Sequence, residues 1–539
     1  MRRRVVVALL AGGASVFAYA PFEWYPLALI AVGMLAWLLA GVARIRHGFA
    51  LGFAWGFGAF VGGVSWLYVA LERYGGMPAP LAALAIALFC AYLALYPGLA
   101  GAPFLALLPR RTGLRSSVAA AAAGAVGASA HAGVEHSLSA DKPAACASAA
   151  PTGPVLAAAL FGALWLLAEW LRGVVFTGFP WLALGYSQTP PRPLAGYLPL
   201  IGAYGVGGLA AFVAALVVFL PAGRGTPARR WAPVAVVGVV LVLGMGLAGR
   251  AWTVPIGAPL PVALVQTNFE QSLKWDPERF ADVLQVNLDL VRAGFADDER
   301  PALVVLPETT LPTLLDRLPE GYLDWLARLA GEAGGDLVMG VFRRDEAGHI
   351  YNAAISLGTA PLQHYAKQHL VPFGEYSPPL FGWFYKLAQI PMSDQTRGAR
   401  DQAPMHFGDQ RVALNICYED LFGAELIRTL PEATLLLNIS NLAWYGDSLA
   451  QPQHLQIARV RALESGRPML RSTNTGMTAL VQPDGSVAGV LPEFERGVLR
   501  VEAQGFTGLT PYARWGDWLA IVAALLVVAA VVAARRARA

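Results

Sequence analysis

The sequence predicts a polytopic α-helical membrane domain followed by a layered α/β domain that faces water. Hydrophobic residues make up 56% of the 539 residues and charged residues only 14%, whereas an average soluble domain has about 25% charged residues. Long apolar runs fill the first half of the chain and return at its end. Only five of the 36 acidic residues precede residue 250, so we expect the membrane part to come first.

Eight apolar segments are candidate membrane spans, because a helix needs about 20 apolar residues to cross the bilayer core. They lie near residues 5–20, 26–43, 48–70, 80–107, 153–174, 195–221, 230–248 and 516–534. The first segment also fits a signal peptide, since M-R-R-R precedes it, but Pro21 directly after A-Y-A disfavours cleavage there. We therefore expect seven spans within 1–250 and an eighth, with a short basic tail, within 514–539.

Arginines predict the orientation of these spans, because basic loops mark the cytoplasmic side. They cluster at both termini and after the second, fourth and sixth spans, at 2–4, 44–46, 110–115, 224–230 and 535–538. By parity, the segment 249–515 between the last two spans lies outside the cytoplasm. The net charge of +4 is interpreted as membrane anchoring, and we expect no nucleic-acid partner. The Ala-, Ser- and Gly-rich segment 113–150 is predicted to be a flexible cytoplasmic insert.

From residue 261 onward the pattern becomes that of a soluble α/β domain. Short apolar runs predict strands that begin near residues 261, 302, 336, 352, 411, 434 and 468. Helical periodicity is present at 278–295, 319–334 and 451–466. Strands this apolar are covered on both faces, so a layered sandwich is expected.

Three ionisable residues follow or flank predicted strands, where α/β sheets bind their ligands. Glu308 follows A-L-V-V-L, Lys367 lies in H-Y-A-K, and Cys417 follows R-V-A-L-N-I. A buried glutamate can take a thiol proton, and a nearby lysine favours the thiolate and can stabilise an oxyanion. The Tyr418 backbone N–H is a second candidate oxyanion donor. Lys367 stands out because the chain has only four lysines against 36 arginines.

Each of these residues has a simpler interpretation when taken alone. Cys417 would be a buried structural thiol, Glu308 a helix N-terminal acid and Lys367 a solvated strand residue. Their joint order and flanking motifs favour a site.

The order Glu, Lys, Cys in L-P-E-T, Y-A-K and I-C-Y-E resembles the nitrilase (carbon–nitrogen hydrolase) superfamily. Narrower motifs, taken with the spans, are similar to those of the apolipoprotein N-acyltransferase family. These motifs are S-L-K-W-D-P at 272–277, H-L-V-P-F-G-E-Y at 369–376, N-I-S-N-L-A-W-Y-G at 438–446 and A-R-V-R-A-L-E-S-G-R-P at 458–468. The resemblance covers nearly the whole chain, and 113–150 matches no motif.

The resemblance implies an extracytoplasmic, nitrilase-like α-β-β-α sandwich over 251–513 in the bacterial inner membrane, on its periplasmic side. It implies transfer of an acyl chain from a phospholipid, through a cysteine thioester, to the α-amino group of a lipoprotein's N-terminal diacylglyceryl-cysteine. Cys417 is then the nucleophile, Glu308 the base and Lys367 the oxyanion-side lysine. Supporting or substrate-binding residues are Trp275, Glu375, Tyr418, Glu419 and Trp444. No cofactor or metal is expected, and membrane lipids are further partners.

Other interpretations stay open from the sequence. A membrane-tethered amidase or nitrilase would use the same three residues with water as acceptor. A transporter would need charged or broken spans, and a Cys–His protease would use a histidine among His364, His369, His406 and His454. Trp275 and Trp444 also suit an interfacial belt, and Glu375 suits an ion-pair partner of Lys367. Arg461 and Glu464 are expected to form an i, i+3 pair on a helix surface.

Overall fold

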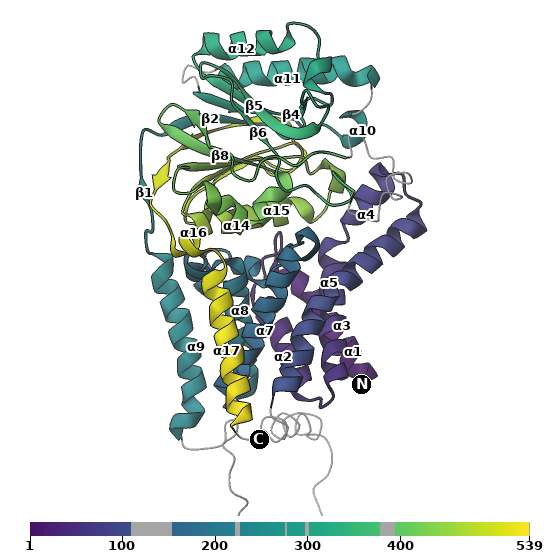
Figure 1. Ribbon diagram of the computed structural model, residues 1–539, viewed down its shortest axis with the longest axis vertical. Helices are drawn as coiled ribbons and strands as arrows, with labels where there is room; N and C mark the ends of the chain where they lie inside the picture. Colours follow the sequence, from purple (N-terminus) through teal and green to yellow (C-terminus); the bar gives the residue numbers. More distant parts are fainter. Residues whose placement is uncertain (109–152, 221–226, 275–276, 297–300, 378–393, 538–539) are drawn as a thin grey trace, which may run out of the picture.

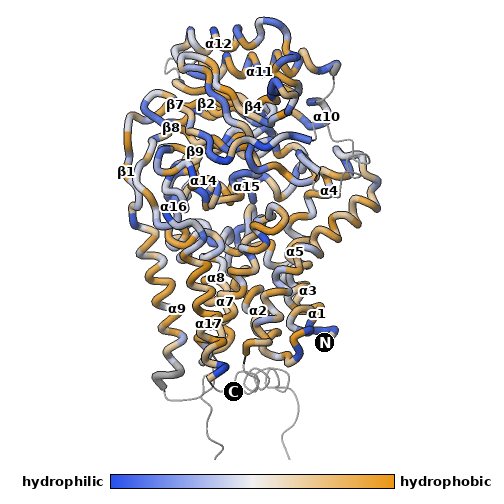
Figure 2. Tube along the Cα trace, viewed as in Figure 1, coloured by the Kyte–Doolittle hydropathy of each residue, from blue (hydrophilic) through white to orange (hydrophobic). Residues whose placement is uncertain are grey.

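The computed structural model describes residues 1–108, 153–220, 227–274, 277–296, 301–377 and 394–537 (Figure 1). An α/β domain stands on one end of a helix bundle, and both chain termini lie at the opposite end. The bundle helices are mostly hydrophobic along their length, whereas polar segments concentrate in the α/β domain (Figure 2). The expected insert 113–150 and the candidate residue Trp275 lie outside the described residues.

Each expected membrane segment overlaps a helix. The bundle consists of α1 (Arg2–Ser15), α2 (Pro26–Ala40), α3 (Ile45–Val64), α5 (Ala79–Leu107), α7 (Pro154–Val174), α8 (Leu198–Phe219), α9 (Pro227–Ala248) and α17 (Trp518–Arg536). Among the described residues, six helices are long and apolar enough to cross a membrane, and α2 is a shorter apolar helix. Because α1 has only 14 residues, the predicted count of eight spans is supported approximately.

Two arginine contacts show which helix ends lie together. The Arg4 guanidinium donates to the Gly41 carbonyl after α2, and Arg535 donates to the Ala106 carbonyl near the end of α5. The arginines near the two termini therefore lie at the end of the bundle that is remote from the α/β domain (Figure 1).

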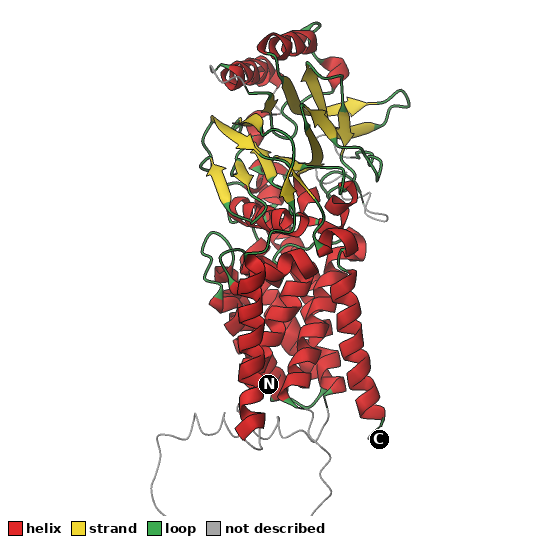
Figure 3. Ribbon diagram, turned by 90° about the vertical axis from the view of Figure 1, so that its left-hand side faces the viewer, coloured by secondary structure: helices red, strands yellow, loops and turns green. Residues whose placement is uncertain are grey.

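The α/β domain contains two six-stranded sheets stacked face to face, with helices on their outer faces (Figure 3). The first sheet has the order β13 (Gly497–Ala503), β2 (Leu260–Gln266), β3 (Leu303–Val305), β4 (Asp336–Arg344), β5 (Ile350–Gly358), β6 (His364–Ala366). The second has the order β12 (Val487–Val490), β11 (Ala479–Val481), β10 (Met469–Thr473), β9 (Leu435–Ser440), β8 (Gln410–Ile416), β7 (Met405–Phe407). Their centres, β2–β3–β4 and β8–β9–β10, are parallel. All seven predicted strands are present.

Alternation along the strands divides the core into layers. Leu264 and Val305 pack with Ile416 and Leu437 between the two sheets. The residues that alternate with these along the strands of the first sheet lie on its outer face. They pack against the predicted helices α11 (Phe280–Phe295) and α12 (Tyr322–Ala333). The second sheet is covered by α14 (Gly423–Leu426) and α15 (Ala450–Ser465). A small sheet of β1 (Val254–Pro255) and β14 (Phe506–Thr507) lies beside them. The α-β-β-α sandwich is confirmed.

Helix α15 lies between the second sheet and the membrane bundle. Leu455 and Ala458 pack on the sheet side, and Ile457 and Val460 pack with the membrane helices. The helix is therefore buried on both sides, although its sequence is rich in polar residues.

The prediction of a surface Arg461–Glu464 pair on this helix is wrong. The two side chains form an ion pair of 2.9 Å, but only 4% and 2% of their areas are exposed. Glu464 also accepts a hydrogen bond from the Ala203 N–H at 2.6 Å, beside a break in α8 at Gly202, where φ is +66°. The bundle covers this face of α15, and the helical spacing alone does not reveal that cover.

Candidate active site

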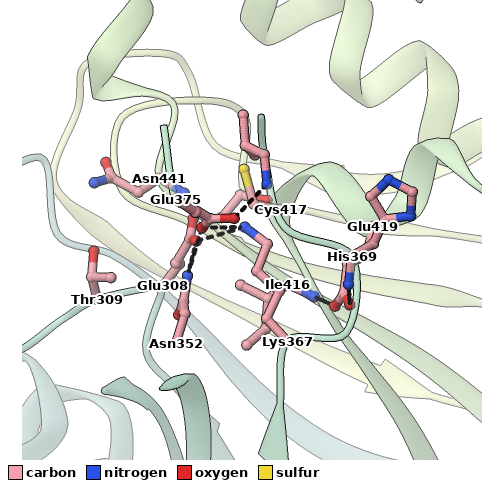
Figure 4. Close-up of polar contacts among 12 residues, drawn as sticks. Glu308, Thr309, Asn352, Lys367, His369, Glu375, Ile416, Cys417, Glu419 and Asn441 are labelled. Atoms are coloured by element: carbon pink, nitrogen blue, oxygen red, sulfur yellow. Dashed lines mark hydrogen bonds and ion pairs between the residues drawn. The ribbon is translucent and has the colours of Figure 1, made fainter. Parts of the chain in front are cut away.

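The three predicted catalytic residues meet where strands of the two sheets end (Figure 4). Glu308 follows β3 and Lys367 follows β6 in the first sheet, whereas Cys417 follows β8 in the second sheet. Because the sheets are stacked, these ends lie close together. Figure 4 shows the Cys417 thiol beside the Glu308 carboxylate and the Lys367 ammonium, and these groups are near enough to interact electrostatically.

Lys367 lies buried between two carboxylates. Its Nζ is 2.7 Å from Glu375 Oε1 and 3.3 Å from Glu308 Oε1, and the three side chains are 1%, 12% and 7% exposed. Burial by itself lowers the pKa of Lys367, but Glu308 and Glu375 outweigh burial and hold that pKa well above its usual value. The lysine therefore stays charged, and Glu375 is its ion-pair partner within the site.

Two asparagines that the sequence analysis missed orient the Glu308 carboxylate. Asn352 Nδ2 donates to Glu308 Oε1 at 2.8 Å and to Glu375 Oε1 at 3.0 Å. The backbone N–H of Asn441 donates to Glu308 Oε2 at 2.8 Å. A polar residue within the apolar run of β5, and another directly after β9, were the signals that could have identified them.

Cys417 begins a short turn, η9 (Cys417–Leu421), with a backbone φ of +54°. A non-glycine residue in this region costs about 1–3 kcal/mol and persists only where its surroundings hold it. Here Asn438 Nδ2 donates to the Cys417 carbonyl at 3.1 Å. The strained conformation directs the residue out of the strand and into the site (Figure 4).

Cys417 is 9% exposed. Burial raises its pKa well above the usual value, Glu308 raises it further, and Lys367 acts in the opposite direction. The resting thiol is therefore protonated at neutral pH, and its reaction needs a base in contact with it. Of the carboxylates that affect this pKa, Glu308 has the largest effect.

Glu419 connects the Cys417 turn to the segment that follows Lys367. Glu419 Oε1 accepts from the N–H groups of Gln368 and His369 at 2.8 and 3.0 Å. Glu419 Oε2 accepts from the Ile416 N–H at 2.6 Å and from the Tyr365 hydroxyl at 3.0 Å. Burial raises the pKa of Glu419 to about 7. The carboxylate thus holds the backbone on both sides of the candidate nucleophile.

Tyr418 connects the same turn to the membrane bundle. Its hydroxyl donates to the Gly178 carbonyl at 2.8 Å, in the loop after α7, and its ring packs among the membrane helices. Trp444, in η11 (Ala443–Tyr445), also faces the bundle, with its ring 6.0 Å from that of Tyr74. The structure therefore places Trp444 at the junction of the two domains.

Of the four histidines named for a Cys–His protease, two have side-chain partners and two are exposed. His454 contacts Asp420 at 2.6 Å and Arg471 at 3.0 Å. His369 contacts Glu425 at 3.2 Å and stacks on Phe422 with ring centroids 3.7 Å apart. His364 and His406 are exposed. These positions do not favour the Cys–His protease interpretation.

Two family models match this chain. The apolipoprotein N-acyltransferase N-terminal domain matches residues 11–216, and the carbon-nitrogen hydrolase model matches residues 261–512. An apolipoprotein N-acyltransferase from Nitrosomonas europaea is 41% identical over 520 residues, which cover 96% of this chain and 94% of that protein. One from Ralstonia nicotianae is 40% identical over 543 residues, covering 99% and 94%.

A carbon-nitrogen hydrolase structure from Helicobacter pylori G27 aligns with 46% of this chain and 89% of its own, at 17% identity and a TM-score of 0.35. The assignment depends on the sequence matches and not on this weak likeness. Fold and spans together define a carbon-nitrogen hydrolase domain carried on a helical membrane domain. The chain belongs to the apolipoprotein N-acyltransferase family.

Proposed function

We propose that this protein moves an acyl chain from a phospholipid, through a thioester on Cys417, to the α-amino group of a lipoprotein's N-terminal diacylglyceryl-cysteine. The observation that carries the proposal is the convergence of Cys417, Glu308 and Lys367 in a buried site that Tyr418 ties to the membrane bundle. Relatives that cover nearly the whole chain are named apolipoprotein N-acyltransferase, which supports a lipoprotein acceptor.

In the first half-reaction, Glu308 takes the proton from Cys417 as the sulfur attacks the ester carbonyl carbon of the phospholipid. The negative charge that develops on the carbonyl oxygen is stabilised by the Lys367 ammonium and the Tyr418 N–H. When the intermediate collapses, the ester C–O bond breaks. The departing lysophospholipid oxygen takes the proton from Glu308, and the acyl chain remains on Cys417 as a thioester.

In the second half-reaction, the free amine of the lipoprotein attacks the thioester carbonyl. Glu308 accepts the amine proton, the C–N bond forms and the C–S bond breaks. The proton then returns to the Cys417 sulfur, which restores the resting site. An ester becomes a thioester and then an amide, so the donor supplies the activation and no nucleotide is consumed.

The supporting residues have distinct proposed roles. Glu375 and Asn352 hold Lys367 and Glu308 in place, because Asn352 donates to the carboxylates of both Glu308 and Glu375. Glu419 holds the Cys417 turn. Trp444 and Trp275 are proposed to contact the lipid substrates, for which the position of Trp444 at the domain junction gives support.

We assign residues 1–250 to a membrane domain, 251–513 to a periplasmic catalytic domain, and 514–539 to a final span with a cytoplasmic tail in the bacterial inner membrane. The terminal arginines at the end of the bundle remote from the α/β domain support this orientation.

The decisive experiment incubates the purified protein with phospholipid alone and measures the mass of the peptide that contains Cys417. We expect an acyl adduct, with lysophospholipid released before any acceptor is present. Cys417→Ala should form none, whereas Cys90→Ala, which changes a buried thiol of α5, should retain it. Absence of an adduct from the unchanged protein rejects the proposal.

A second stage identifies the acceptor. The adduct should persist in buffer and discharge when a diacylated lipopeptide with a free amino terminus is added. The same lipopeptide with a blocked amine should leave the adduct in place. Rapid discharge in buffer, indifferent to the lipopeptide, would replace the transferase with the tethered hydrolase.

A further inference from the structure

A second buried lysine lies behind the candidate base. Lys274 ends the short helix α10 (Gln271–Lys274) and is 2% exposed. Its Nζ lies 2.9 Å from Thr309 Oγ1 and 3.4 Å from the Glu308 carbonyl oxygen. Lys367 binds the carboxylate of Glu308, whereas Lys274 binds the backbone and the next side chain. The mechanism above gives Lys274 no role.

The residue that Lys274 contacts is strained. Thr309 has φ of +48°, a value that a β-branched residue rarely adopts. The next residue is anchored separately, because the Thr310 N–H donates to the Gly340 carbonyl at 2.9 Å and Asn287 donates to the Thr310 carbonyl at 3.0 Å. Strain of this kind persists only where neighbours hold it, and Lys274 bonds the Thr309 side chain itself.

Helix α10 braces the Glu308 carboxylate through a second contact. Gln271 Oε1 accepts from Asn441 Nδ2 at 3.0 Å, and the Asn441 N–H is the donor to Glu308 Oε2. One four-residue helix therefore holds both the turn that carries Glu308 and the residue that binds its carboxylate.

The charge state of Lys274 is sensitive to pH near neutrality. An ammonium has three donors, while the described residues offer two acceptors, both neutral. Burial lowers the pKa of Lys274 to about 7, and the charge of Glu308 opposes that change. Of the other nearby charges, Glu270 is paired with Arg73 at the surface, and Lys367 lies at the Glu308 carboxylate.

We propose that Lys274 is a positioning residue for Glu308: its amine holds the 308–309 turn so that the carboxylate meets Asn441, Asn352 and Lys367. The inference depends on the proposed function, in which Glu308 is the base. A displaced carboxylate would still be present but would take the thiol proton poorly, since misplacement by about 1 Å costs up to about 10²-fold in rate.

The test measures single-turnover acylation of Cys417 as a function of phospholipid concentration and pH. Lys274→Met removes the amine and keeps the apolar stem, Thr309→Val removes the acceptor, and Thr309→Ser keeps the hydroxyl. We expect each of the first two changes to lower the maximal rate about 10- to 100-fold, with the half-saturating phospholipid concentration unchanged. Thr309→Ser should stay near the native rate. Arg279→Met, at an exposed cation nearby, is the matched control.

Two readouts separate positioning from a merely structural role. Since both residues act through one contact, the Lys274→Met/Thr309→Val double variant should be no slower than the slower single variant. The native rate should rise as pH passes about 7, where Lys274 loses its positive charge beside Glu308. Lys274→Met should lack this rise.

Acylation of Lys274→Met at the native rate would overturn the inference while the proposed function stands. The same holds if the rate losses of the two single variants add in the double variant and the pH profile of Lys274→Met is unchanged from the native one. If Lys274→Met does not fold, the comparison of Thr309→Val with Thr309→Ser decides, and equal rates for these two variants overturn the inference. No adduct on the unchanged protein would instead reject the proposed function.

Discussion

At the scale of single residues, Glu308 has the sharpest test. Glu308→Gln keeps the shape and the contact with Asn352, but an amide cannot take the Cys417 proton. We expect acyl-adduct formation to slow about 10²–10⁴-fold, the usual contribution of a general base. Time-resolved mass spectrometry of the Cys417 peptide measures it. Glu320→Gln, at an exposed glutamate, is the control. Full activity of Glu308→Gln, together with loss on substitution of His369, would favour the Cys–His interpretation.

Glu419 predicts a pH dependence of stability. Its pKa is raised by burial from 4.5 to about 7, so between these values the folded protein binds more protons than the unfolded chain. Stability should therefore fall as pH rises through this window. In Glu419→Gln, stability should fall less between about pH 5 and about pH 8. Thermal unfolding of both proteins at these two pH values measures the difference.

Glu419→Gln should also slow the acylation of Cys417. The Ile416 N–H needs an acceptor at Glu419 Oε2, and a side-chain amide has one acceptor oxygen in place of two. The Cys417 turn then loses one of its supports. An unchanged pH dependence of unfolding in Glu419→Gln would contradict the assignment of this titration to Glu419.

At the scale of elements, strand β4 supports the turn that carries Glu308. A Cβ at Gly340 would lie 2.7 Å from the Glu308 Cα, the Pro307 carbonyl oxygen and the Thr309 nitrogen. Gly340→Ala should therefore displace the turn, costing about 1–3 kcal/mol in unfolding free energy and up to about 10²-fold in acylation rate.

Gly331→Ala is the control for this prediction, because a Cβ at Gly331 in α12 meets no atom within 4 Å. This variant should match or exceed native stability, since alanine favours a helix over glycine, and it should acylate normally. Equal activity of the Gly340→Ala and Gly331→Ala variants would show that the turn tolerates displacement.

At the scale of the whole molecule, the orientation in the membrane is open to direct measurement. A membrane-impermeant thiol reagent should label Glu346→Cys, at an exposed site of the β4–β5 hairpin, in cells whose outer membrane is permeable to it. It should not label Arg46→Cys, at the opposite end of the bundle, or the native Cys146. The reverse pattern would place the α/β domain in the cytoplasm and reject the proposed location of the chemistry.

Much of the architecture follows from the sequence by itself. The membrane segments can be recognised because a helix needs about 20 apolar residues to cross the bilayer. The strands and helices of the α/β domain can be recognised by their different periods of apolar residues. The positions of Glu308 and Cys417 directly after apolar strands indicated a shared site. The approximate agreement on the number of spans has a local reason, since α1 and α2 are shorter than the apolar segments that they overlap.

Only the tertiary structure decided what surrounds these residues. Asn352, Asn441 and Lys274 reach Glu308 across separations of 44, 133 and 34 residues. Likewise, Arg461 and Glu464 are buried because the membrane bundle covers them. Periodicity records which face of an element is apolar, but a polar residue is buried or exposed according to the partner that covers it. That partner comes from a distant part of the chain, and folding brings the two together.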